Sequence, residues 1–316
     1  MDNSKILEYF NINLWRSLGY TGKGITAIEM ESPNSSHAQK VVESALFFAP
    51  DLDIKCISSG YTTSGENVNG AILDTIDYII ENKIDLFGSA TAGSENKQLN
   101  ELFQKAIDLG SIGGTSAGNT GDTDNPYLTE FAKANVLISV GSVNYSNKNK
   151  RFYKEDYSST GEELDYVMVV PHNRMGTSFA FPALVFGMFA LIQQFFYEKT
   201  GKKLNQEQMV RFVDDYCVDL GEQEIDENFG RGLLILPNPE DIDIYKYIGR
   251  DDMEIKLIID EDIAYVDGEE YQLNIAPFIK DDRTFLPVRD IAEILRLKVG
   301  WDGETRTVTL TGDVIV

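Results

Sequence analysis

The chain has 316 residues, with 51 acidic against 28 basic side chains and a formal net charge of −23. A surface this acidic repels phosphate groups, so the composition argues against nucleic acid and anionic membranes as partners. The two cysteines, Cys56 and Cys217, are far apart and belong to no cluster with metal-ligand spacing. They predict reduced, buried thiols, and the length suggests about two domains.

Strands and helices alternate along the first part of the chain. Apolar runs bounded by turn residues predict strands, and apolar side chains at helical spacing predict helices. The predicted strands are 25–30, 52–57, 84–87, 111–115, 136–141 and 167–170. The predicted helices are 8–20, 37–48, 69–82 and 95–109. This alternation predicts an α/β fold, a parallel sheet with helices on both faces, and chemistry at the carboxyl ends of its strands.

The most apolar run of the sequence begins at 176–182, GTSFAFP, and continues to Tyr197. It predicts a helix buried inside the domain, because Pro182 and the early Gln193 interrupt it too soon for a membrane span. Ser178 then lies at the helix N-terminus, where unpaired backbone N–H groups stabilise a developing negative charge. A nucleophilic serine and an ordinary helix cap both fit this position.

The pattern changes after a further amphipathic helix at 206–216 and a strand-like stretch at 230–235. Residues 237–252 are acidic and contain prolines, which predicts a linker. Short strands, an Asp267-Gly268 hairpin turn and one helix at 288–295 follow, which predicts a small separate α+β module. We therefore expect two domains, 1–245 and 254–316.

Several motifs, taken in order, make the first domain resemble the subtilisin-like serine proteases. The segments that carry the resemblance are 14–25, 116–119 (SAGN), 140–143 (VGSV), 157–161 (YSSTG) and 176–182 (GTSFAFP). The resemblance implies that Ser178 is the nucleophile and that Asn119 and the Ser178 N–H hold the oxyanion. Since the family's domain begins near residue 13, we expect the chain to fold without removing a pro-domain.

The resemblance implies an acid and a histidine before the serine, in that order. His37 begins a predicted helix, as the family's histidine does, whereas His172 lies in a loop that carries no catalytic residue in the family. The family's aspartate is replaced here by Glu31, only six residues before His37. Glu29 has the same strand parity and is the rival acid, but it lies one pleat further from the carboxyl end. We expect a Glu31–His37–Ser178 triad.

The resemblance also implies an extended peptide bound along the strand ends, bordered by Ser89, Ala90, Ser116, Ala117 and Gly118. The expected partner is a protein or peptide substrate. No metal or other cofactor is expected. Two acidic residues in the loop after Asn119 fit calcium, but a solvated loop is the simpler interpretation; they are Asp122 and Asp124. The N-terminus has no signal-peptide pattern, so we expect a cytoplasmic protein.

The C-terminal module resembles the copper amine oxidase N-terminal-like domain found in many bacterial proteins, which suggests a bacterial or phage origin. The resemblance is carried by VDGE at 266–269, RTFLPVRDIA at 283–292, VGWD at 299–302 and TVTL at 307–310. The stretch contains no His or Cys, so copper and oxidase activity are not implied. Attachment or protein binding is its expected role.

The sequence therefore predicts a serine endopeptidase that hydrolyses peptide bonds through an acyl-enzyme. The alternative is a catalytically inactive subtilisin-like scaffold that acts as a binding or structural protein. The short segment before His37 and the changed acid favour the alternative, whereas the intact Gly-Thr-Ser motif and Asn119 favour the enzyme.

Overall fold

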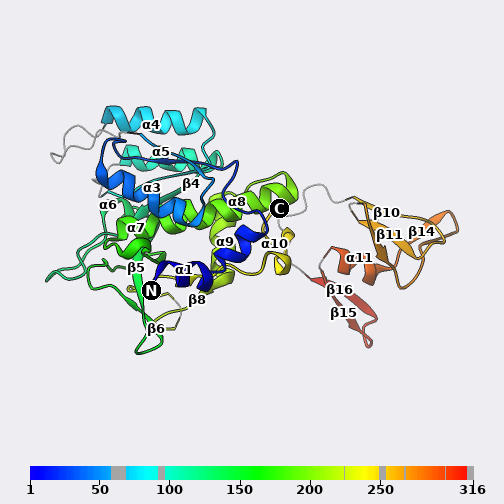
Figure 1. Ribbon diagram of the computed structural model, residues 1–316. Helices are drawn as coiled ribbons and strands as arrows, with labels where there is room; N and C mark the ends of the chain where they lie inside the picture. Colours follow the sequence, from blue (N-terminus) through cyan, green and yellow to red (C-terminus); the bar gives the residue numbers. More distant parts are fainter. Residues whose placement is uncertain are drawn as a thin grey trace. The chain divides into compact units, whose positions relative to one another are not determined.

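The computed structural model describes residues 1–57, 69–91, 97–223, 225–248, 254–266, 268–295 and 297–311 (Figure 1). The chain divides into two compact units, Met1–Tyr247 and Ile248–Val316.

A 7-stranded sheet lies at the centre of the first unit. Its strands run in the order β2-β1-β3-β4-β5, and both β7 and β6 pair with the long β5. All of these pairings are parallel except that of β6, so the predicted parallel sheet is confirmed. The strands are β1 Thr26–Glu29, β2 Asp53–Cys56, β3 Leu86–Ser89, β4 Ile112–Ser116, β5 Ile138–Ser146, β6 Arg151–Lys154 and β7 Tyr166–Val169.

Helices cover both faces of this sheet (Figure 1). On one face, α4 (Asn69–Glu81) and α5 (Lys97–Asp108) share a core with Ile28 and Phe87. The adjacent strand residue, Gly88, faces the other way: a Cβ built on it would lie 2.5 Å from Phe181 of the central helix. The same face carries α3 (Ser36–Phe48), while the short α6 (Glu130–Lys133) precedes β5.

The central helix is continuous over Thr177–Thr200 and comprises α7 (Thr177–Phe181), η2 (Pro182–Met188) and α8 (Phe189–Thr200). It is apolar and long enough to cross a membrane, but its apolar window is entirely buried inside the unit, as predicted from the sequence. The middle part, η2, is a π-helix that begins at Pro182. Proline has no N–H and its ring clashes with the carbonyl four residues earlier, which explains the wider winding.

The N-terminal helix expected over 8–20 is wrong in its extent. The chain instead forms α1 (Asn3–Tyr9) and α2 (Ile12–Ser17). Asn11 separates them with a left-handed backbone (φ 59°), a conformation that asparagine tolerates better than most residues.

The predicted linker at 237–252 is wrong in its first part. After α9 (Gln206–Tyr216) and a ladder of β8 (Cys217–Val218) with β9 (Leu233–Leu234), the chain forms η3 (Pro239–Asp241) and α10 (Tyr245–Ile248). Tyr247 is 2% exposed and packs its ring 5.1 Å from that of Phe212. Proline and acidic side chains mark this stretch as polar, but one buried aromatic residue makes it part of the first unit.

The described residues of the second unit form a small α+β module with a three-stranded sheet, two further hairpins and one helix. Ala264, Leu273 and Ile294 form its buried core. The predicted hairpin joins β11 to β12, although Asp267 of its turn lies outside the described residues. The elements are β10 Ile255–Leu257, β11 Ile263–Val266, β12 Glu269–Gln272, β13 Phe278–Lys280, β14 Arg283–Phe285, α11 Val288–Ile294, β15 Lys298–Asp302 and β16 Thr307–Thr311.

Candidate active site

The segment between β1 and α3 brings an acid and a histidine together. Glu31 lies two residues beyond the end of β1, and His37 lies in the first turn of α3. Ser35 caps that helix, because its hydroxyl accepts hydrogen bonds from the backbone N–H groups of His37 and Ala38 at 3.1 and 3.3 Å. The same hydroxyl donates to Glu31 Oε1 at 2.6 Å, so one serine fixes both the helix start and the acid.

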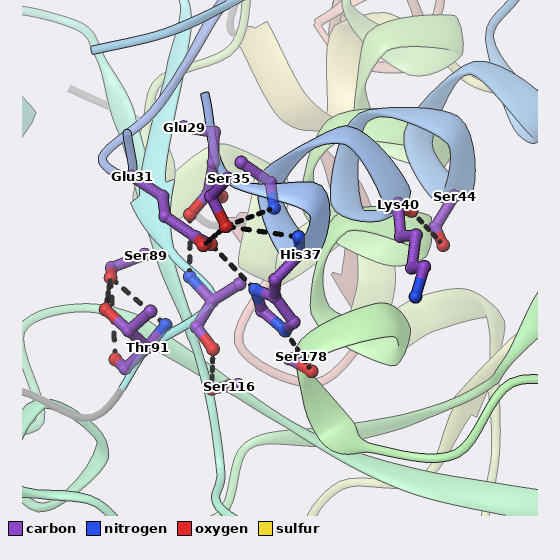
Figure 2. Close-up of polar contacts among 12 residues, drawn as sticks. Glu29, Glu31, Ser35, His37, Lys40, Ser44, Ser89, Thr91, Ser116 and Ser178 are labelled. Atoms are coloured by element: carbon purple, nitrogen blue, oxygen red, sulfur yellow. Dashed lines mark hydrogen bonds and ion pairs between the residues drawn. The ribbon is translucent and has the colours of Figure 1, made fainter. Parts of the chain in front are cut away.

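Glu31, His37 and Ser178 form one chain of hydrogen bonds (Figure 2). Glu31 Oε2 lies 2.7 Å from His37 Nδ1, and His37 Nε2 lies 3.1 Å from Ser178 Oγ. The Glu31 side chain is 13% exposed and the His37 side chain 37% exposed. An imidazole between a carboxylate and a serine hydroxyl can take the hydroxyl proton while the carboxylate stabilises the resulting charge.

Ser178 is the second residue of the central helix and does not cap it. Gly176 occupies the cap position, with no side-chain hydrogen bond, and Ser178 Oγ contacts His37 instead. The helix-cap interpretation of Ser178 is therefore wrong. Its backbone N–H has no acceptor among the described residues, whereas Thr177 N–H and Phe179 N–H donate to Asn119 Oδ1 and to Gly176 O.

The Asn119 amide and the Ser178 hydroxyl border the same space, which lies over Gly176. Its Oδ1 accepts from Thr177 N–H at 2.9 Å and lies 3.2 Å from Thr177 Oγ1, which fixes the orientation of the amide. A Cβ built on Gly176 would lie 3.1 Å from Ser178 Oγ and 3.7 Å from Asn119 Nδ2. The space over the Gly176 Cα is thus bordered by a hydroxyl and an amide N–H group, and glycine keeps it open.

Glu29, the rival acid, does not contact His37. Its side chain is buried, its Oε1 accepts from Ala90 N–H at 2.9 Å, and its Oε2 has no partner among the described residues. Burial raises the pKa of the Glu29 carboxyl well above its ordinary value, because the charged form loses its hydration inside the domain. The nearby charge of Glu31 adds to this effect. Burial likewise raises the pKa of Cys56, the strand partner of Glu29, to about 11.

The residues predicted to border the substrate lie at the carboxyl ends of β3 and β4. Figure 2 shows two of them, Ser89 and Ser116, beside the hydrogen-bonded chain. All five are buried: Ser89, Ala90, Ser116, Ala117 and Gly118. Hydrogen bonds join the two strand ends, because Ser116 Oγ donates to Ala90 O at 3.2 Å. This hydrogen bond ties the end of β4 to the residue that follows β3.

The other polar residues that the sequence singled out lie outside this arrangement. His172 is exposed, and its Nδ1 lies 3.0 Å from Asn3 Nδ2. Asp122 and Asp124 are exposed in their loop. Across the part of the chain that the structure describes, no group of three or more His, Cys, Asp or Glu side chains is arranged to hold a metal.

Three residues that shape the site were missed in the sequence. Ser35 lies just before the predicted helix at 37–48, but its bond to Glu31 depends on the turn between them. Thr177 orients Asn119 across 58 residues of sequence, and Arg174 reaches α3 from the loop before Gly176. Contacts between distant segments leave no periodic signal along the chain.

Solved structures show which fold this is. The chain is similar to a lanthipeptide protease (17% identity, TM-score 0.55), covering 74% of this chain and 95% of that one. It is similar to fervidolysin from Fervidobacterium pennivorans, a keratinolytic enzyme related to subtilisin (14% identity, TM-score 0.56), covering 72% of this chain and 44% of that one. A third is the prenylagaramide maturation protease PagA (15% identity, TM-score 0.57), with 71% and 95% covered.

The family model of the copper amine oxidase N-terminal domain matches residues 246–310. No curated protein matches the chain by sequence. The structural likeness, at identities of 14–17%, concerns the fold. The chain thus has a subtilisin-like α/β fold over most of its length, followed by a region, 246–310, that matches the copper amine oxidase N-terminal domain.

Proposed function

We propose that the protein is a serine endopeptidase that cleaves peptide bonds through an acyl-enzyme on Ser178. The observation that carries the proposal is the unbroken contact from Glu31 Oε2 through the His37 ring to Ser178 Oγ, at 2.7 and 3.1 Å. An accidental buried serine would need neither a histidine at hydrogen-bond distance nor a carboxylate behind that histidine.

In the proposed reaction, Ser178 Oγ attacks the carbonyl carbon of the peptide as His37 Nε2 takes its proton. Glu31 accepts the Nδ1–H of His37, which leaves Nε2 as the basic nitrogen and stabilises the imidazolium. His37 then gives the proton to the departing amine, and the acyl group remains on Ser178 Oγ. Water, deprotonated by His37, attacks the ester and restores the serine.

The carbonyl oxygen becomes an oxyanion during both attacks. Asn119 Nδ2 and the Ser178 backbone N–H are its proposed donors, because Nδ2 borders the space over Gly176 and the N–H has no acceptor among the described residues. The N-terminal end of the central helix adds its dipole to this stabilisation.

The proposed substrate is a peptide or protein held along the ends of β3 and β4. The neighbouring structures are proteases, among them a lanthipeptide protease and a prenylagaramide maturation protease, which supports a peptide substrate. We propose that the reaction needs no metal or other cofactor. We also propose that the C-terminal domain attaches the enzyme to another protein. The proposed compartment is the cytoplasm.

Hydrolysis of an internally quenched peptide library, analysed by mass spectrometry, tests the proposal. The parent is expected to cleave peptides at internal bonds, and Ser178→Ala and His37→Ala are expected to abolish cleavage. His172→Ala is the matched control, because it removes the other histidine of the chain and is expected to retain activity. A folded parent that cleaves no member of the library would support the inactive scaffold.

A further inference from the structure

The connection between β7 and the central helix carries a half-buried arginine. It begins with the short η1 (Pro171–Asn173) and ends at Gly176, and Arg174 lies between them. The Arg174 side chain is only 18% exposed, although the neighbouring Met175 is 74% exposed. An arginine turned inward beside an exposed methionine indicates that its guanidinium has a specific set of partners.

The hydrogen-bond partners of the guanidinium all lie on α3, the helix that carries His37. Arg174 Nη1 donates to Lys40 O at 2.7 Å and to Ser44 Oγ at 3.3 Å, and Nη2 pairs with Glu43. Lys40 and Ser44 follow His37 by three and seven residues, so they continue the helix side on which His37 lies (Figure 2). The guanidinium therefore holds the segment before Ser178, residues 174–177, against the side of α3 that carries His37.

Phe179 strengthens the same junction. Its ring centroid lies 5.3 Å from that of His37, and the guanidinium carbon of Arg174 lies 5.5 Å from the Phe179 ring centroid. Phe179 directly follows Ser178 in the chain. The His37 ring and the Arg174 guanidinium therefore both pack against a ring that is joined to the segment carrying Ser178. Cation–π contact and bidentate hydrogen bonding are both properties of arginine that lysine reproduces poorly.

The two contacts of His37 differ in what maintains them. Glu31, Ser35 and His37 belong to one short segment, so local geometry fixes the contact with Glu31. Ser178 lies 141 residues away, and its contact depends on how α3 meets the central helix. The far end of α3 packs closely there, since a Cβ on Gly187 would lie 2.7 Å from Phe48 Cβ. Nearer to Ser178, the hydrogen bonds of Arg174 connect α3 to the segment before the central helix.

We infer that Arg174 is a positioning residue that sets the distance between His37 Nε2 and Ser178 Oγ by clamping the segment before Ser178 to α3. The inference rests on the proposed function for its catalytic consequence. It predicts that removing the guanidinium separates His37 from Ser178 and leaves the Glu31–His37 contact unchanged.

The experiment compares the parent with Arg174→Ala and Arg174→Lys. Arg211→Ala is the matched control, since Arg211 pairs with Glu207 on the exposed side of α9. The second-order rate of fluorophosphonate labelling at Ser178 and the Tm are measured for each. Arg174→Ala is expected to slow labelling by about a hundredfold, the scale of a 1 Å misplacement, while remaining folded at the assay temperature. Arg174→Lys is expected to lie between Arg174→Ala and the parent, and Arg211→Ala is expected to match the parent.

Crystal structures of the parent and Arg174→Ala give a readout that does not depend on activity. In the variant, Nε2 and Oγ should lie beyond hydrogen-bond reach, about 3.5 Å, with Glu31 still bonded to Nδ1. An unchanged labelling rate, or a retained His37–Ser178 contact, would overturn the inference. If the folded parent itself does not label, the proposed function fails, and the two structures still decide whether Arg174 holds the pair together.

Discussion

At the scale of single residues, the acid of the site is a glutamate that reaches a histidine only six positions away. Aspartate, one methylene shorter, would need the backbone of the β1–α3 turn to lie closer to the imidazole. Glu31 reaches Nδ1 at 2.7 Å while Ser35 holds its other oxygen at 2.6 Å. Both carboxylate oxygens therefore have a partner, as expected for a carboxylate that must orient a ring.

The first prediction concerns Glu31→Gln. The substitution keeps the size of the side chain but removes its charge and can place an N–H against Nδ1, which selects the wrong tautomer. Turnover is expected to fall about 10⁴-fold, the loss measured for the corresponding amide substitution in a serine protease triad. Steady-state peptide hydrolysis measures it. Glu29→Gln is the matched control, and an equal loss in both variants would show that Glu31 has no special role.

The second prediction concerns the stability of Glu29→Gln as a function of pH. Glutamine preserves an acceptor for Ala90 N–H and cannot ionise. In the parent, the folded-state pKa of Glu29 is raised by burial, so the unfolded chain loses a proton that the folded chain retains. The parent's stability must then fall as the pH rises from about 4.5 towards the folded-state pKa.

The Tm difference between Glu29→Gln and the parent is therefore expected to grow in favour of the variant across that window. Thermal unfolding at a series of pH values measures it. A difference that stays constant with pH would mean that Glu29 is ionised in the folded protein.

At the scale of elements, sequence periodicity identified the sheet, its helices and the buried helix after Ser178, because each depends on local apolar spacing. The exceptions are positions where one residue overrides the pattern. Asn11 breaks a helix through its backbone conformation, and Pro182 widens another into a π-helix. Tyr247 anchors a stretch whose composition suggests a linker.

The residues of the site likewise fall into those that the sequence predicted and those that only the structure revealed. The resemblance singled out Glu31, His37, Asn119 and Ser178, and the structure brings these four together. The side chains that orient them, Ser35, Thr177 and Arg174, act through contacts that form only after folding. Composition and spacing contain no information on such contacts.

The third prediction concerns Gly176, which caps the central helix with φ 127°. Alanine there would carry a strained backbone and place a methyl group 3.1 Å from Ser178 Oγ, inside the proposed oxyanion space. The rate at which a fluorophosphonate labels Ser178 is expected to fall by about a hundredfold.

The control for Gly176→Ala is Gly110→Ala. Gly110 has a similar φ of 104° with nothing within 4 Å of an added Cβ, so it reproduces the strain without the contact. Both variants are expected to lose about 1–3 kcal/mol of stability. Equal labelling rates in the two variants would contradict the assignment of the space over Gly176.

At the scale of the whole molecule, the boundary between the two units lies at the end of α10, between Tyr247 and Ile248. Tyr247 packs on Phe196 and Phe212, its hydroxyl donates to Asp215 at 2.6 Å, and Lys246 pairs with the same carboxylate. The first unit is therefore completed by residues that follow the predicted boundary at 245.

The fourth prediction compares two truncated chains. A chain ending at residue 248 is expected to keep the Tm of the first unit and its labelling at Ser178. A chain ending at residue 244 loses Tyr247 and should be less stable by about 3–5 kcal/mol, or about 10 °C in Tm. Calorimetry of both chains measures the difference. Equal Tm values would mean that α10 contributes nothing to the first unit.

The central claim is that Ser178 is a nucleophile activated by His37. The most direct measurement is active-site labelling with a fluorophosphonate, quantified by intact mass and located by peptide mapping. One adduct per chain, on Ser178, is expected in the parent, with no adduct in Ser178→Ala and strongly slowed labelling in His37→Ala. A folded parent that acquires no adduct, or an adduct that persists in Ser178→Ala, would contradict the claim.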